Sequence, residues 1–260
     1  MQYRAIEALN PPFNRVPKVT ADFWLIKLMA VTVGETAADF LAVNLGYGLT
    51  VTSLFMAGVL VVALVFQFAQ RKYVPWAYWL AVVLISVVGT LITDNMVDNF
   101  GIRLETSTIF FAVALSLTFA IWYRFERTLS IHSIFTTRRE VFYWLAILFT
   151  FSLGTAAGDL VAETFDLGFL ITGMIFGVVI AIIAFAHFYL EMDAIPAFWL
   201  AYILTRPLGA SFGDLLSQPQ EYGGFGFGTA VTSWLFLGGI AATVLYMTLS
   251  RDGEEVAVGA

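Results

Sequence analysis

The sequence predicts an all-α integral membrane protein, with eight transmembrane helices arranged as four parallel helical-hairpin repeats and pseudo-symmetry about the membrane normal. Its 260 residues are 60% hydrophobic and only 12% charged, whereas a soluble domain is roughly 25% charged. The apolar residues gather in eight long runs, and one short motif recurs four times. Such a chain cannot cover itself with polar atoms in water, so the lipid bilayer is its predicted partner. This excludes a soluble enzyme, a nucleic-acid binder and a secreted disulfide scaffold.

The eight apolar runs are the predicted transmembrane helices, because each is close to the roughly 20 residues that cross the hydrocarbon core. In chain order they are Phe23–Leu45, Thr50–Phe68, Trp76–Val97, Thr108–Tyr123, Phe142–Ala162, Phe169–Phe188, Ala197–Leu216 and Thr229–Leu249. Residues 1–260 form a single membrane domain, with predicted repeats at about 21–72, 75–127, 140–192 and 195–250. Residues 1–20 and 251–260 are the predicted tails. The first twenty residues lack the apolar segment of a cleaved signal peptide.

Basic residues set the predicted orientation, because Lys and Arg in short loops are retained on the cytoplasmic side. Ten of the thirteen lie in the N-terminal arm, in the loops after the second and fourth runs, and in the C-terminal tail. The opposite loops contain only Arg103, while Lys27 and Arg206 lie inside predicted spans. We therefore expect an inner-membrane protein with both termini in the cytoplasm. The glycine-rich run Tyr222–Gly228 is expected to form a flexible outer loop.

An aromatic-Trp-Leu triplet opens every odd-numbered run and identifies the repeat. Ten residues after each tryptophan lies a glycine, and fifteen residues after it lies an aspartate. The tryptophans are Trp24, Trp79, Trp144 and Trp199; the glycines are Gly34, Gly89, Gly154 and Gly209; the aspartates are Asp39, Asp94, Asp159 and Asp214. Four gap-free copies indicate a two-helix unit that was duplicated twice. Because each unit has two spans, all four cross in the same direction, which places equivalent residues at one depth.

The tryptophans and glycines are interpreted mainly as structural residues. Each tryptophan falls at the cytoplasmic boundary, where an amphipathic indole fits the headgroup region; a gate or a ligand-stacking site is the alternative. Each glycine lies about 15 Å along its helix, near the midplane. The absence of a side chain there allows helices to approach closely, so we expect helix contacts at the glycines.

The aspartates carry the functional prediction. A carboxylate about 22 Å from the cytoplasmic boundary still lies in the hydrocarbon core, where a charge is costly and marks a candidate functional site. An acidic residue lies one helical turn from three of them, namely Glu35, Asp98 and Glu163. Two carboxylates on one helix face repel each other. They therefore retain a proton, bind a cation or are reached by water.

Oxygen ligands without Cys or His favour hard cations such as Mg²⁺, Ca²⁺ or Mn²⁺. Thr52, Ser107 and Thr172, each twenty-eight residues after a repeat tryptophan, would supply further oxygens. The four aspartates are thus predicted to bind a divalent metal ion or protons, while no resident cofactor is identified. In the alternative interpretation, the aspartates only bond the backbone of the next hairpin, cap the start of an even-numbered helix or pair with Arg103.

Two basic residues inside the predicted spans, Lys27 and Arg206, have no counterpart in the other repeats. Lys27 lies near the cytoplasmic boundary, and its amine is expected to extend to the membrane surface. Arg206 lies about 10 Å inside the membrane and needs an acidic partner, for which Asp214, Glu35 and Asp159 are the candidates. Arg206 is interpreted either as a specialised site or as a clamp that holds the fold.

With its four tryptophan-centred units, Phe23–Leu249 resembles a family of bacterial membrane proteins that consist of four tandem repeats of unknown function. Each repeat of that family has two transmembrane segments and a characteristic tryptophan. The resemblance implies the eight-helix topology. It implies no settled activity, although it favours transport.

We therefore predict a permease for a cation, either a divalent metal or a proton-coupled substrate. A second hypothesis is a non-transport membrane protein, whose repeat is structural and whose cytoplasmic loop Arg124–Glu140 binds a partner. An intramembrane metal-dependent enzyme ranks third, because neither a histidine ligand set nor a nucleophile motif accompanies the paired acids. The transported species, its direction and the oligomeric state stay open.

Overall fold

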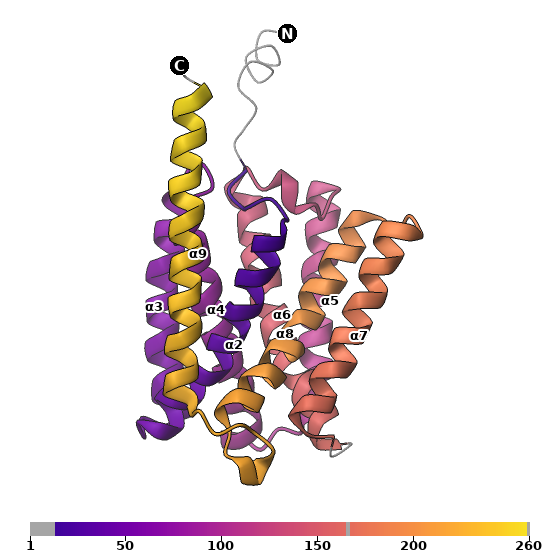
Figure 1. Ribbon diagram of the computed structural model, residues 1–260. Helices are drawn as coiled ribbons and strands as arrows, with labels where there is room; N and C mark the ends of the chain where they lie inside the picture. The colour runs from indigo at the N-terminus through magenta and orange to yellow at the C-terminus, as the bar shows by residue number, and fades with distance from the viewer. Residues whose placement is uncertain (1–13, 165–166, 259–260) are drawn as a thin grey trace.

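The computed structural model describes residues 14–164 and 167–258, without the side chains of Glu163 and of residues beyond Ser250. The described residues form eight long α-helices and no strand (Figure 1). The helices are α2 (Ala21–Asp39), α3 (Leu49–Ala69), α4 (Pro75–Asp94), α5 (Leu104–Glu126), α6 (Thr137–Thr164), α7 (Gly168–Tyr189), α8 (Ala194–Ser217) and α9 (Thr229–Val258). Short 3₁₀ turns lie at Ile131–Ser133 and Gln220–Tyr222. The outer parts of the predicted tails, residues 1–13 and 259–260, lie outside the described residues.

Local sequence explains where several helices begin. Thr20 precedes α2, and its hydroxyl accepts a hydrogen bond from the Phe23 N–H at 3.3 Å, as an N-cap residue does. Asp193 caps α8 in the same way. Pro75 occupies the first turn of α4, where a missing N–H costs nothing. Gly48 precedes α3 with a φ of 75°, a conformation that glycine adopts without strain.

Two of the repeat aspartates lie where the helix type changes. α2 ends at Asp39 and α4 ends at Asp94, and each is followed by a five-residue π-helical turn, Phe40–Asn44 and Asn95–Asn99. π-helical turns are rare in proteins, and many of those that occur lie at functional sites. In contrast, α6 and α8 continue past their aspartates as α-helix. The first two repeats therefore differ from the last two at the aspartates.

The helices form an inner and an outer set. The inner helices contact one another in a closed order: α2 with α4, α4 with α6, α6 with α8 and α8 with α2. The outer helices α3, α5, α7 and α9 expose many large apolar side chains, such as Leu54, Val62 and Trp234. An apolar surface of this extent is not stable in water. Lipid is therefore the expected neighbour of the outer helices.

Each outer helix packs most extensively against the inner helix of the following repeat. These pairs are α3 with α4, α5 with α6, α7 with α8 and α9 with α2. Equivalent repeat positions meet in them. Ser53 on α3 donates a hydrogen bond to the Leu91 carbonyl on α4 at 3.4 Å, and the Ser233 hydroxyl on α9 lies 2.7 Å from that of Thr36 on α2. The two helices of a repeat are consecutive in sequence, but the outer one covers the next repeat.

Six of the described helices are long and apolar enough to cross a membrane, namely α3, α4, α5, α6, α7 and α9. α2 and α8 fall outside this set, although the sequence predicts eight spans. They carry Lys27, Glu35 and Arg206 in their interior turns, and in the inner set they are surrounded mainly by protein. α2 begins and α9 ends at the same end of the bundle, and the connections after α2, α4, α6 and α8 lie at the other end (Figure 1).

Candidate functional site

The aromatic residues of the four triplets fill the interior at the end where the inner helices begin. The residue before each tryptophan contacts the tryptophan of a neighbouring repeat. The pairs are Phe23–Trp79, Tyr78–Trp144, Tyr143–Trp199 and Phe198–Trp24, with ring centroids 5.5, 5.5, 6.3 and 5.8 Å apart. The last pair joins the fourth repeat to the first. We refer to this end of the inner helices as the aromatic end.

Three of the tryptophans are enclosed by protein. Trp79 is 1% exposed, and Trp144 and Trp199 are each 4% exposed. Their indole N–H groups donate hydrogen bonds to protein acceptors, namely the Tyr73 hydroxyl, the Glu140 carboxylate and the Leu129 carbonyl. These three indoles therefore contact protein and not lipid headgroups, because their helices belong to the inner set; their depth in the membrane stays a prediction. Trp24 is partly buried.

The repeat glycines lie where neighbouring inner helices approach most closely. A methyl group added at each glycine would meet the residue seven positions after the tryptophan of the next repeat. The facing pairs are Gly34 with Ser86, Gly89 with Phe151, Gly154 with Arg206 and Gly209 with Val31. Glycine carbonyls accept hydrogen bonds across two of these contacts, from Ser152 to Gly89 and from Thr32 to Gly209, both at 3.2 Å. The glycines therefore let the inner helices pack in a closed ring.

Arg206 lies at one of these glycine contacts and is completely buried. Its Nη2 donates hydrogen bonds to Glu35 Oε2 at 2.7 Å and to the Thr90 hydroxyl at 2.5 Å. Of the three acidic partners that the sequence leaves open, Glu35 forms the ion pair. α8, α2 and α4 therefore meet at a buried charge, whose desolvation cost is offset only by well-placed partners.

Lys27 is also completely buried, so the prediction that its amine reaches the membrane surface is wrong. Its Nζ lies 3.8 Å from the centroid of the Phe151 ring and 4.1 Å from that of the Tyr202 ring. Both rings come from other inner helices. The amine is directed inward because α2 is covered by α4, α8 and α9.

The repeat aspartates lie at the opposite end of the inner helices, next to the connections that lead to the outer helices. Their side chains are partly buried. Asp94 and Asp214 are each repelled by the charges of Glu35, Asp39 and Asp159 and attracted by that of Arg206. The C-terminal end of a helix carries partial negative charge, so a carboxylate there is not stabilised by its own helix. We refer to this end of the inner helices as the acidic end.

The acidic side chains that the structure describes do not combine into a metal-ligand cluster. No three His, Cys, Asp or Glu residues among the described side chains are arranged to hold a metal ion. The four repeat aspartates, which come from four different helices, therefore do not form the single divalent-metal site that the sequence predicts. Asp98 is exposed in the π-helical turn that follows Asp94. Glu163 lies on α6, but its side chain is outside the described residues.

The hydroxyls twenty-eight residues after three of the tryptophans lie in the first turns of outer helices, at the acidic end. Thr52, Ser107 and Thr172 are 3%, 0% and 1% exposed. Among the described residues, their hydroxyl oxygens have no hydrogen-bond partner. In the fourth repeat, five inserted residues bring Thr232 into the equivalent place on α9, where its hydroxyl instead donates to the Gly228 carbonyl at 2.9 Å. Three buried hydroxyls thus retain free hydrogen-bonding capacity.

Two polar residues that join neighbouring helices are not identified from the sequence. Thr90 accepts the hydrogen bond from Arg206, and Asn95 donates from Nδ2 to Ser53 Oγ at 2.6 Å. The position of each polar residue within a long apolar run was the only feature of the sequence that could have indicated its role. Its partner is decided by contacts between helices that are far apart in sequence.

A carboxylate also lies at the aromatic end, where Glu140 is completely buried in the first turn of α6. It binds Nη1 of Arg15 at 2.5 Å and Nε2 of Gln67 at 3.0 Å. Asn14 donates to the Ile131 carbonyl at 2.9 Å. These bonds attach the N-terminal arm to the loop between α5 and α6.

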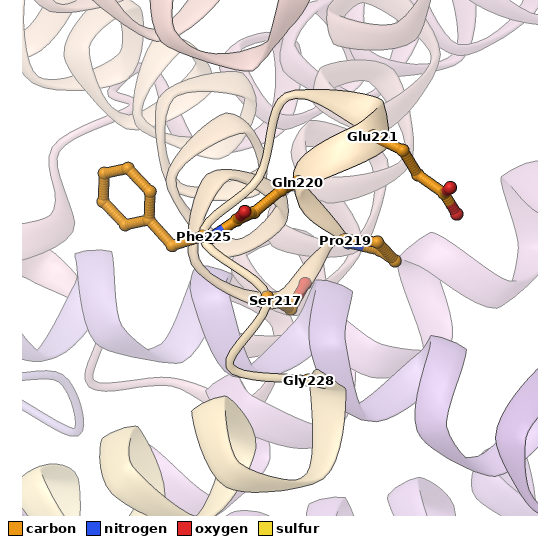
Figure 2. A pocket seen from close by; sticks show the side chains of 7 residues that line it. Ser217, Pro219, Gln220, Glu221, Phe225 and Gly228 are labelled. Carbon is orange, nitrogen blue, oxygen red and sulfur yellow. The ribbon is translucent and has the colours of Figure 1, made fainter.

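The connection after α8 is held in place and is not the flexible loop that its glycines predict. Its backbone N–H groups at residues 225–228 donate hydrogen bonds to carbonyls at residues 215–218, at 2.7 to 3.1 Å. The loop borders an open hollow of about 500 Å³. Figure 2 shows Phe225 and Glu221 on opposite sides of the loop, with Ser217 between them. This hollow lies at the acidic end of α8.

A larger, mostly apolar cavity of about 690 Å³ lies at the aromatic end. It is bordered by α2, α7, α8 and residues 129–132, and both His132 and His187 line it. Nδ1 of His187 lies 2.8 Å from the Met192 carbonyl oxygen, so this histidine is engaged by the turn between α7 and α8. The cavity is separate from the acidic end.

Comparison with known proteins finds the same fourfold division. A family model described as Repeat of Unknown Function (DUF347) matches residues 23–73, 77–128, 142–193 and 197–252. No curated protein and no solved structure matches the chain. Each matched segment contains one inner helix and the outer helix that follows it.

Proposed function

Because the chain belongs to the family of DUF347 repeats, whose description names no activity, we propose its function from the geometry of the two ends. The protein is a permease of the inner membrane that couples the passage of its substrate to proton binding at the repeat aspartates. Its eight helices cross the bilayer, and its four repeats are related by a pseudo-fourfold axis along the membrane normal.

The closed order of contacts supports this symmetry. The aromatic contacts and the glycine contacts each link one repeat to the next, and both link the fourth repeat to the first. The positions of the Lys and Arg residues support an orientation with both termini in the cytoplasm. In this orientation the acidic end faces outward and the aromatic end faces the cytoplasm. The buried aromatic rings favour alternating access over an open pore.

The interacting charges at the acidic end carry the proposal. Asp39, Asp94 and Asp214 are each repelled by Glu35 and attracted by Arg206. Proton binding removes the repulsion between buried carboxylates. It also removes their attraction for Arg206, whose partners belong to α2 and α4. A proton taken up from outside thereby alters the contacts between inner helices, which is the coupling that a proton-driven permease needs.

Protons are favoured over a divalent metal as the coupling cation. A metal ion requires several ligands at short distances from one point, and no three acidic side chains among the described residues provide this. A proton requires only one carboxylate. The four aspartates on four helices therefore suit protons.

A partner-binding role for the loop Arg124–Glu140 has less support, because many of its charges are paired within the chain. Arg138 and Arg139 both bind the Glu126 carboxylate. Glu140 binds Arg15 of the N-terminal arm. These contacts stabilise the loop itself and leave fewer charged groups for another protein.

Proton flux in proteoliposomes tests the proposed function. The liposomes contain a pH-sensitive dye, and an inward proton gradient is applied with a panel of monovalent cations, divalent cations and small anions outside. We expect solute-dependent acidification with the wild type. Asp94→Asn and Asp159→Asn should each slow it by about tenfold or more, because asparagine has no titratable proton.

Asp22→Asn is the matched control, because Asp22 is exposed in the first turn of α2, far along the helix from Asp39. This variant should keep the wild-type rate. Equal rates in the wild type, Asp94→Asn and Asp159→Asn would contradict the role of the aspartates. Rates equal to those of empty liposomes with every solute would contradict the permease.

A further inference from the structure

Several buried donor atoms near the centre of the inner set lack an acceptor among the described residues. They are Nζ of Lys27, Nε and Nη1 of Arg206, the hydroxyl of Tyr202 and the hydroxyl of Ser86. All four side chains are completely buried. A buried polar group without a partner destabilises the folded state, and a charged group does so more strongly. These groups therefore require a ligand that accepts hydrogen bonds.

The donors come from three inner helices that meet at one level. Tyr202 and Arg206 are one turn apart on the same face of α8. The Lys27 amine on α2 lies over the Tyr202 ring at 4.1 Å, and the charge of Arg206 repels it. Ser86 on α4 lies one turn before Thr90, which accepts a hydrogen bond from Arg206. Two cations thus approach each other from α2 and α8.

The local charges do not balance. Glu35 pairs with Arg206 at 2.7 Å and offsets one positive charge. The Phe151 and Tyr202 rings attract the ammonium of Lys27, but such contacts offset only part of the cost of burying an isolated ion. With Lys27 protonated, its positive charge has no hydrogen-bonded anion among the described side chains.

We propose that Lys27, Arg206 and Tyr202 bind a small monovalent anion, of the class that includes chloride, nitrate and formate. A single negative charge balances the excess, and the complete burial of the three side chains limits the ligand to a few atoms. Charge-assisted hydrogen bonds from the ammonium and the guanidinium hold it, and the Tyr202 hydroxyl donates a further bond. The assignment rests on the proposed permease function and names its substrate class.

The acidic end determines when this site fills. Asp39, Asp94 and Asp214 lie between the outer connections and Arg206, and while ionised they repel an anion that enters from outside. Once the aspartates are protonated, they no longer repel the anion. Proton binding therefore precedes or accompanies anion binding, so protons and the anion cross in the same direction.

Thermal unfolding of the purified full-length protein in detergent tests the anion site. Sodium gluconate is replaced at constant ionic strength by sodium chloride, nitrate or formate. A ligand that binds the folded state raises the unfolding midpoint, so a saturable rise is expected for the wild type. Lys27→Met, which has a side chain of similar length without charge, should abolish this rise.

Tyr202→Phe gives the test a second arm, because it removes only the hydroxyl and keeps the ring beside Lys27. It should shift half-saturation to a several-fold higher anion concentration. Lys18→Met removes an exposed lysine of the N-terminal arm and should leave the anion dependence unchanged. A wild-type midpoint that does not respond to any of the three anions overturns the site. An equal response in the wild type, Lys27→Met and Tyr202→Phe overturns it as well.

Asp94→Asn separates this inference from the proposed function. If it keeps the anion-dependent rise but loses proton flux, both stand. If the wild type moves no protons yet shows a rise that depends on Lys27, the permease fails and the anion site stands. If proton flux depends on Asp94 but none of the three anions changes the unfolding midpoint, the permease stands and the anion site fails.

Discussion

Arg206 illustrates how one position of a repeat acquires a different role. The equivalent residues in the other repeats are Val31, Ser86 and Phe151, each of which faces a repeat glycine. The stem of Arg206 lies against Gly154, where a larger residue would collide with it. The guanidinium can then reach Glu35 on another inner helix. A contact made for helix packing in three repeats has become an ion pair in the fourth.

Substitution of Glu35 should destabilise the protein, because it leaves a buried guanidinium without its carboxylate. Breaking a buried ion pair typically costs about 3 to 5 kcal/mol, and we expect Glu35→Gln to lower the free energy of unfolding by about this amount. Reversible unfolding in mixed micelles measures it.

Arg206→Gln combined with Glu35→Gln provides the control for this prediction. Because the double variant has neither buried charge, it should recover much of the stability lost in Glu35→Gln, which a double-mutant cycle detects as coupling. Additive losses would show that the ion pair does not join the two helices.

The inner helices differ from ordinary transmembrane helices because most of their surface faces protein and not lipid. Their glycines contact neighbouring helices, and their polar residues bond across the ring, as Thr32 does to the Gly209 carbonyl. Low hydropathy in α2 and α8 follows from this position, because a helix covered by protein does not need an apolar surface all round. The outer helices supply that surface instead.

A side chain added at a ring glycine should weaken the packing of α2 on α4. Gly34→Ala places a methyl group against Ser86, and overpacking of this kind costs about 1 to 3 kcal/mol. Gly58→Ala on α3 is the matched control, because a methyl group there meets nothing within 4 Å. Unfolding of both variants under the same conditions compares them. Ser86→Gly added to Gly34→Ala should restore part of the loss, and equal stability of Gly34→Ala and Gly58→Ala would refute the close contact.

The whole molecule is an interlocked ring. Because each outer helix packs mainly on the inner helix of the following repeat, each inner helix is covered chiefly by another repeat's outer helix. The last contact, α9 on α2, joins the two ends of the chain. The eight helices are therefore expected to form one cooperative unit, although the sequence divides into four similar parts.

A disulfide between the first and last repeats tests this closure. The chain has no cysteine, and the hydroxyls of Thr36 and Ser233 are 2.7 Å apart, near the spacing of bonded sulfurs, which is about 2.05 Å. Thr36→Cys with Ser233→Cys should form a bond within one chain on mild oxidation, which mass spectrometry of the digested protein identifies. The control pair is Thr36→Cys with Ser53→Cys, since Ser53 is the equivalent residue on α3 of the first repeat. A bond in the control pair but not in the first pair would mean that the outer helices cover their own repeats.

The extent to which the sequence predicts the site differs between residues. Gly34 and its equivalents could be assigned to helix contacts, because duplicated units pack through the same positions. Lys27 and Trp79 were assigned to the membrane surface, since their place along the helix matches the boundary region. Both are buried, because the environment of a residue near a helix end depends on which neighbouring helices surround it. Distance along one helix does not contain this information.

The sequence by itself determined the membrane class and the four units, because hydropathy and spacing are properties of the chain read in order. Only the tertiary structure decided that Glu35 binds Arg206 and that each outer helix covers the next repeat. It also decided that the aspartates form no shared metal site among the described side chains. These features depend on distances between helices that are far apart in sequence, and no local pattern records such distances.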